Sequence, residues 1–197
     1  MGLLVAGLLI FFVIHLVPAY QNLRHRLIYG MGETLYKILF AVVSLAGIYL
    51  IAKGYGEARL VAPDLWDPPL WTRHITMLLM LLAFIMLASA YIPSRIRDKL
   101  KHPMLASVKT WALAHLIANG DGASLLLFGG FLMWAVYDRI SVGRRSAMGP
   151  LGDRKGSLGG DIAAIAVGVV AYLLMVFWGH EALIGVPVIP AMVDIPS

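Results

Sequence analysis

The sequence predicts an all-α fold, a polytopic transmembrane helical bundle of about six spans. Hydrophobic residues make up 60% of the 197 residues and charged residues only 14%, whereas a soluble domain is nearer half apolar and a quarter charged. The mean hydropathy is +0.81. No polar stretch is long enough for a separate soluble domain, so we expect residues 1–197 to form a single integral membrane domain.

Apolar runs separated by turn-forming and charged residues predict the individual spans. A helix needs roughly 17–25 apolar residues to cross the hydrocarbon core of a bilayer. The first and fourth runs are the shortest, and the turn "NGDG" follows the fourth. The six predicted spans are Leu3–Pro18, Leu35–Lys53, Leu70–Ile92, Pro103–Ala118, Ala123–Ile140 and Asp161–His180.

The basic residues predict how these spans are oriented. The net charge is +5 and the isoelectric point is near 9.6. The odd-numbered connections and their flanks carry twelve Lys and Arg, the even-numbered ones carry three, and the C-terminal tail carries none. Cytoplasmic connections carry the excess of basic residues in membrane proteins. We therefore expect a multi-pass protein of the cell inner (cytoplasmic) membrane with both termini outside, in the periplasm, and no nucleic-acid partner.

Histidines at the ends of spans or inside them are the candidate ligands. Intramembrane ionisable groups are costly, so each is a functional hypothesis, and neutral imidazole is the commonest protein ligand for metals. The chain has no cysteine, which excludes thiolate ligands and disulfides. Two histidines on facing helices suit a haem b iron better than zinc, which needs three or four close ligands. The five histidines concerned are His15, His74, His102, His115 and His180.

His115 is the residue that topology explains least. The predicted topology puts it in the outer half of its span, about 20 Å along the helix from His102. Trp111 precedes it by four residues and Asn119 follows it by four, so these side chains share a face and are candidate cofactor contacts. Lys109, in the same span, is close enough to the cytoplasmic interface to extend its ammonium there.

Depth in the membrane leaves several ligand pairs open. Two axial ligands of one iron must lie at nearly the same depth. By that criterion His115 pairs with His74 or His180, and His15 pairs with His102. Helix tilt would be needed to bring His15 and His115 to one iron.

Motifs along nearly the whole chain resemble those of the NnrU family, which includes the 15-cis-ζ-carotene isomerases. The most specific block is "HPMLASVKTWALAHLIANGD". It is accompanied by "FFVIHLVP" in the first span, "GETLYKILFAVVSLAGIYLI" in the second and "WTRH" at the third. "FGGFLMWAVYDRIS" lies in the fifth, and "AYLLMVFWGH" ends the sixth.

The resemblance implies haem b as cofactor and iron as metal. The ligand histidines of the isomerases correspond to His15 and His115, which we take as the first pair, with His74, His180 and His102 as alternates. The isomerases have a cysteine three residues before the later ligand, and Ala112 stands at that position here. Thiolate-dependent ligand exchange is therefore excluded in this chain.

The resemblance also bounds the expected function. We expect a haem-b-binding membrane protein linked either to nitric oxide and nitrite respiration or to cis–trans isomerisation of an apolar, carotenoid-like polyene. One alternative is a non-enzymatic assembly or maturation factor that binds a respiratory complex. Another is a methyltransferase-like membrane enzyme, suggested by a similarity of the "KHPM" corner to isoprenylcysteine-type methyltransferases.

Overall fold

The structure, a computed structural model, describes residues 1–145 and 149–189, and every extended regular element there is helical. This confirms the predicted all-α class. The elements, in chain order, are α1 (Gly2–Leu16), η1 (Val17–Ala19), α2 (Gln21–Met31), α3 (Glu33–Ala58), α4 (Thr72–Ser89), α5 (Arg95–Leu100), α6 (Pro103–Ala118), α7 (Gly122–Arg144), α8 (Leu158–Leu174), the π-helical η2 (Met175–Gly179) and α9 (His180–Ile184).

Each predicted span corresponds to one of these helices. Five helical segments are long and apolar enough to cross a membrane, namely α1 with η1, α3, α4, α7, and α8 with η2 and α9. The sixth, α6, has only 16 residues and lies between α4 and α7. The bounds of α6 match the prediction. The last span begins at Leu158 rather than at Asp161. It begins earlier because the Ser157 hydroxyl caps the helix by accepting a hydrogen bond from the Gly160 N–H at 3.0 Å.

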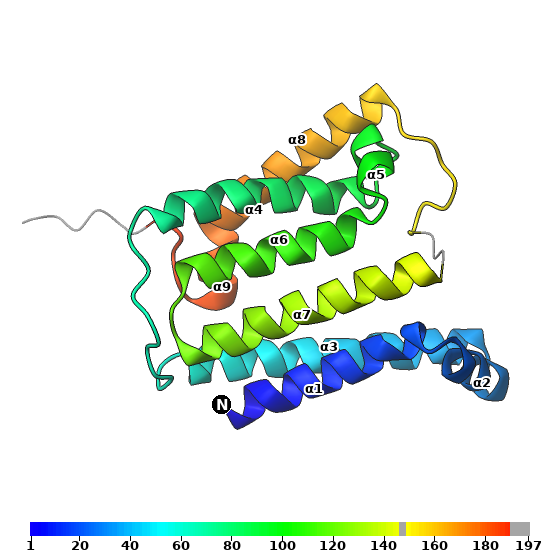
Figure 1. The fold of residues 1–197 in the computed structure, drawn as a ribbon, viewed down its shortest axis with the longest axis horizontal. Helices are drawn as coiled ribbons and strands as arrows, with labels where there is room; N and C mark the ends of the chain where they lie inside the picture. The colour runs from blue at the N-terminus through cyan, green and yellow to red at the C-terminus, as the bar shows by residue number, and fades with distance from the viewer. Residues whose placement is uncertain (146–148, 190–197) are drawn as a thin grey trace, which may run out of the picture.

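Two helices are too polar or too short for a hydropathy pattern to predict. The first, α2, is rich in Arg, Asn and Gln and contains no buried residue. The second, α5, has six residues and begins where the Ser94 hydroxyl accepts a hydrogen bond from the Arg97 N–H at 3.1 Å. Both lie at the same end of the bundle, which we call the α5 end (Figure 1).

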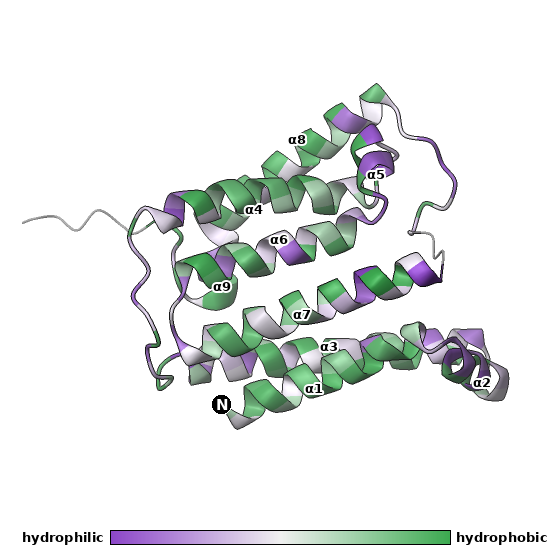
Figure 2. Ribbon diagram, in the orientation of Figure 1, coloured by the Kyte–Doolittle hydropathy of each residue, from purple (hydrophilic) through white to green (hydrophobic). Residues whose placement is uncertain are grey.

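The long helices alternate in direction, so the connections gather at two ends (Figure 1). The three basic connections of the sequence lie at the α5 end, where hydrophilic residues cluster on α2, on α5 and beyond α7 (Figure 2). The opposite end, which we call the α9 end, holds residues 59–71, the turn between α6 and α7, and α9. The fold therefore places the basic residues of all three odd-numbered connections on one side of the protein.

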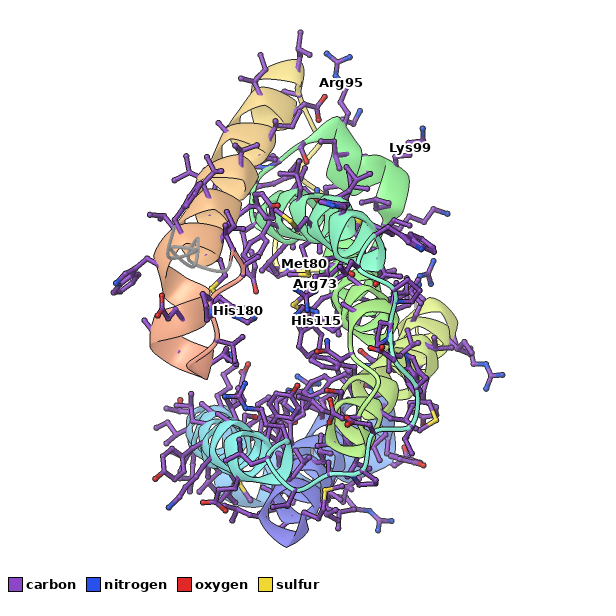
Figure 3. The ribbon with its side chains drawn as sticks, turned by 90° about the vertical axis from the view of Figure 1, so that its left-hand side faces the viewer. Arg73, Met80, Arg95, Lys99, His115 and His180 are labelled. Carbon is purple, nitrogen blue, oxygen red and sulfur yellow. The ribbon has the colours of Figure 1, made fainter. Side chains whose placement is uncertain are left out.

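In cross-section the helices follow an arc rather than a closed ring (Figure 3). The order of packing is α3, α1, α7, α6, α4 and α8, with α3 also touching α7. Among the described residues no comparable packing joins α8 to α3, α6 or α7. At the α9 end one hydrogen bond links the two ends of the arc, from Arg59 Nη2 to the Ile184 carbonyl oxygen at 3.2 Å.

The tightest part of the core lies between α1 and α3. Leu4 and Ala58 are fully buried there, and Leu8 and Phe11 nearly so. A Cβ atom built on Gly54 would lie 2.3 Å from the Leu4 backbone nitrogen, so only glycine permits this approach. Small residues at such crossings are what allows membrane helices to pack closely.

The outer helices are joined by polar contacts as well as by packing. Ser107 on α6 donates to the Ala83 carbonyl oxygen of α4 at 2.8 Å, and Thr76 on α4 donates to the Ala114 carbonyl oxygen of α6 at 2.8 Å. Gly168 brings α8 against α4, because a Cβ there would lie 2.6 Å from the Ile85 Cα. These contacts hold α6 and α8 at set positions on either side of α4.

Candidate functional site

His115 lies near the α9 end of α6, and both its ring and its backbone carbonyl have hydrogen-bond or stacking partners. Its Nδ1 lies 2.9 Å from the Trp111 carbonyl oxygen, and its ring stacks on Phe128 of α7 at 4.6 Å between centroids. The Asn119 side-chain amide donates to the His115 carbonyl oxygen at 2.8 Å. Since a carbonyl oxygen only accepts, Nδ1 carries the hydrogen and Nε2 keeps a free lone pair.

Trp111 and Asn119 therefore contact His115, as their helical spacing predicts. The Trp111 and His115 ring centroids are 5.5 Å apart. Neither side chain presents a donor atom to the ring nitrogen that is free. The Trp111 main-chain carbonyl sets the tautomer and the Trp111 ring packs beside the imidazole, which is the usual task of groups around a metal-binding histidine.

His180, which lies at the α8 end of the arc, also has its Nδ1 bonded to a backbone carbonyl. It begins α9 directly after the π-helical turn η2, and its Nδ1 lies 2.6 Å from the Val186 carbonyl oxygen. That carbonyl is brought back to the ring because the chain reverses at Gly185, which has φ of 74°. His180 thus also presents Nε2 as its free nitrogen, and π-helical turns of this kind are frequent at functional sites.

The two imidazoles face one another. Figure 3 shows His115 and His180 pointing toward each other across the open interior of the arc, with Arg73 and Met80 of α4 on the same side. We call this region the interior site. Arg73 and Met80 are seven residues apart and so lie on one face of α4; that spacing is the signal by which the sequence could have identified them.

His15 lies at the other end of the bundle. Its Nδ1 lies 2.8 Å from the Phe11 carbonyl oxygen, and its ring centroid is 3.9 Å from that of Phe11 and 5.5 Å from that of Trp134. On α7, Trp134 is six residues beyond Phe128, the residue that stacks on His115, a separation of roughly 9 Å along the axis.

The two imidazoles therefore pack against different residues of α7, and no ring contact in the described structure joins them directly. The pair of His15 and His115 stays a prediction. A run of aromatic rings fills the space between them instead: Phe11 contacts Phe131 at 5.2 Å, and Phe131 contacts Trp111 at 5.4 Å.

The other two histidines lie away from the interior site. His74 is exposed, and nine residues separate it from Ala83, which places it on the opposite side of α4 from the α6 interface. His102 precedes α6 at the α5 end and is half-buried beside a separate cavity. Of the three alternates, His180 is the one that points toward His115 in Figure 3.

The donor set of the interior site fits haem better than zinc. In the described part of the chain no three His, Cys, Asp or Glu side chains come close enough to bind one metal ion, whereas a haem iron needs only one or two protein ligands. The interior site offers two Nε2 lone pairs, the Met80 thioether and the Arg73 guanidinium, which is the natural partner of a haem propionate. These residues fit the cofactor.

Comparison with known proteins identifies one family. The model of the NnrU protein family matches residues 3–188, which is nearly the whole chain and includes every helix described above. No curated protein and no solved structure shows significant similarity.

Proposed function

Since the chain belongs to the NnrU family, we propose that it is a membrane protein that binds haem b at the interior site, where His115 and His180 would hold the iron. The observation that carries this proposal is the pair of imidazoles that face each other, each with Nδ1 bound to a backbone carbonyl and Nε2 free. A bound haem would supply iron-centred redox or ligand-binding chemistry.

In this chemistry the protein's own residues would orient the two histidines and position the haem. The Trp111 and Val186 carbonyls keep the hydrogen on Nδ1 of each histidine, which leaves each Nε2 as a ligand at neutral pH. The Phe128 ring holds the plane of His115. Arg73, at the polar end of α4, would pair with a propionate and so set which edge of the haem faces the α9 end.

The openness of the arc supports an apolar or gaseous substrate. Because α3 and α8 do not pack on each other in the described structure, and the Arg59–Ile184 hydrogen bond joins the ends of the arc at the α9 end alone, we expect the hydrocarbon of a bilayer to reach the interior site between these helices. Nitric oxide and a carotenoid-like polyene are both more soluble in hydrocarbon than in water, and both are consistent with this access. A linkage to nitric oxide and nitrite respiration, or isomerisation of such a polyene, remains the proposed role.

The test is optical spectroscopy of histidine variants. We expect protein purified in detergent from haem-replete cells to show a Soret band, and pyridine haemochromogen analysis to identify haem b. His115→Ala and His180→Ala should each lose the six-coordinate, low-spin spectrum or the haem itself. His74→Ala is the matched control, because His74 lies on the opposite side of α4, and its spectrum should equal that of the parent.

Two results would contradict the proposal in different ways. Absence of any Soret band would refute haem binding, and copurification of a respiratory oxidoreductase with such cofactor-free protein would favour an assembly factor. A spectrum changed by His15→Ala but not by His180→Ala would keep the haem and refute the ligand pair. Feeding the tri-cis carotene to cells expressing the protein would separate an isomerase from a nitric oxide-linked role.

A further inference from the structure

A second candidate site lies at the α5 end, far from the interior site. A half-open cavity of about 320 Å³ lies there between the end of α5, the start of α6 and the last turns of α7. Apolar side chains and basic groups share its wall, including Arg97, Lys101, His102, Met104, Leu105 and Val142. The proposed function uses none of these residues.

The backbone at Lys101 has a rare conformation. The His102 N–H donates to the Leu100 carbonyl oxygen at 2.7 Å, and Lys101 between them has φ of 63° and ψ of −43°. This is a classic γ-turn, which is uncommon and strained. Lys101 is the only residue other than glycine with positive φ in the described part of the chain. Glycine would form the turn at lower cost, so a lysine here indicates that its side chain has a use.

The charge in the cavity wall is positive. Arg97 is held by the loop that follows α7, since its guanidinium donates to the carbonyl oxygens of Gly152 and Arg154. Its Nη1 also lies 3.5 Å from the Asp98 carboxylate, so the guanidinium is both fixed and paired with an acidic group. The acidic group in the wall, Asp138, is paired with Arg145 at 3.2 Å. Lys101, for which the described part of the chain shows no ion pair, is therefore the basic group of the wall that remains available to an anion.

The place of the cavity identifies the kind of anion. Its lining residues lie at the end of the bundle where the spans stop. The basic connections gather at the same end (Figure 2), which corresponds to the level of the lipid headgroups. Its wall has the two parts that a phospholipid requires, a cationic side chain, Lys101, for a phosphate and apolar ones, Met104 and Val142, for the glycerol and upper acyl chain. The first turn of α6, which begins at Pro103, adds free backbone N–H groups.

We propose that this cavity binds the phosphate of an anionic phospholipid, with Lys101 as the charged contact. A phosphate that is free in solution shares this chemistry, so the experiment has to distinguish the two sources. Lys99 provides the matched control, because it lies on α5 with its side chain pointing away from the bundle (Figure 3).

The test uses the whole protein in detergent, titrated with phosphatidylglycerol and read by native mass spectrometry. We expect Lys101→Gln to weaken phosphatidylglycerol binding about fivefold, the effect of one basic residue at an anionic surface. Lys99→Gln should bind like the parent. Phosphatidylcholine should bind weakly to all three proteins and equally.

Lys101→Gly separates lost binding from lost folding. Glycine relieves the γ-turn, so this variant should unfold at a higher temperature than Lys101→Gln and still bind phosphatidylglycerol about fivefold more weakly than the parent. Equal phosphatidylglycerol affinity in Lys101→Gln, Lys99→Gln and the parent would overturn the site. Displacement of phosphatidylglycerol by millimolar inorganic phosphate, with phosphate alone stabilising the parent fully, would overturn the assignment to a lipid.

Discussion

Replacing Gly54 by alanine tests whether the α1–α3 crossing holds the bundle together. The added Cβ would lie 2.3 Å from the Leu4 backbone nitrogen and 2.7 Å from its Cα, whereas ordinary contacts begin at 3.4 Å. Both clashing atoms are backbone, so no side chain can rotate away. The helices would have to separate by about 1 Å, and overpacking of this kind costs about 1–3 kcal/mol.

Gly56, two residues further along α3, is the matched control. No heavy atom lies within 4 Å of a Cβ built there, so Gly56→Ala meets no clash. That change should be neutral or stabilising by up to about 1 kcal/mol, because alanine favours a helix over glycine. The two single substitutions are chemically identical and lie on the same helix. Their free energies of unfolding should therefore differ by about 1–4 kcal/mol.

The assay is reversible unfolding in mixed micelles with increasing dodecyl sulfate, followed by circular dichroism. Gly54→Ala should shift the midpoint to lower dodecyl sulfate, and Gly56→Ala should leave it unchanged or raise it. If the two variants unfold at the same midpoint, the close approach of α1 to α3 does not limit stability, and the reasoning from Gly54 fails. The burial of Leu4, which is 0% exposed, would then need another explanation.

Two further predictions concern polar groups at helix ends. Asp121 caps α7 by accepting from the Ala123 and Ser124 N–H groups at 3.0 and 2.9 Å, so Asp121→Ala should lower the free energy of unfolding by about 1–2 kcal/mol, while Asp121→Asn keeps most of the cap. Burial, and secondarily the charge of Arg139, lower the pKa of His102 below its ordinary value, and Arg139→Gln should move it back upward in an NMR titration. Because folded His102 then binds a proton less readily than the unfolded chain, its contribution to stability is present above about pH 6.5 and is lost as the pH falls below that. A histidine pKa at or above 6.5 in the folded protein would contradict this, and His102→Gln should flatten the dependence.

The sequence alone determined the class of fold and the position of nearly every span. Hydropathy is a property of local composition, and a helix in hydrocarbon satisfies its own backbone hydrogen bonds, so the pattern translates directly into helices. The bounds of α6 were predicted to the residue because Pro103 begins the helix and the Asn-Gly-Asp-Gly turn ends it. The basic connections likewise proved to lie at one end of the bundle. Short polar helices such as α2 and α5 carry no such pattern and escaped prediction.

Only the tertiary structure decided which histidines meet. Spacing along the chain places His15 and His115 at different depths in the membrane. This conflicts with their pairing by family resemblance unless the helices are tilted. In the fold their rings pack against different residues of α7, Trp134 and Phe128, and other aromatic side chains lie between them. His180 faces His115 because α8 packs on α4 and the π-helical turn and Gly185 orient the last helix toward the interior. Contacts between helices distant in sequence depend on packing geometry, such as the close approach at Gly168, and local composition does not encode that geometry.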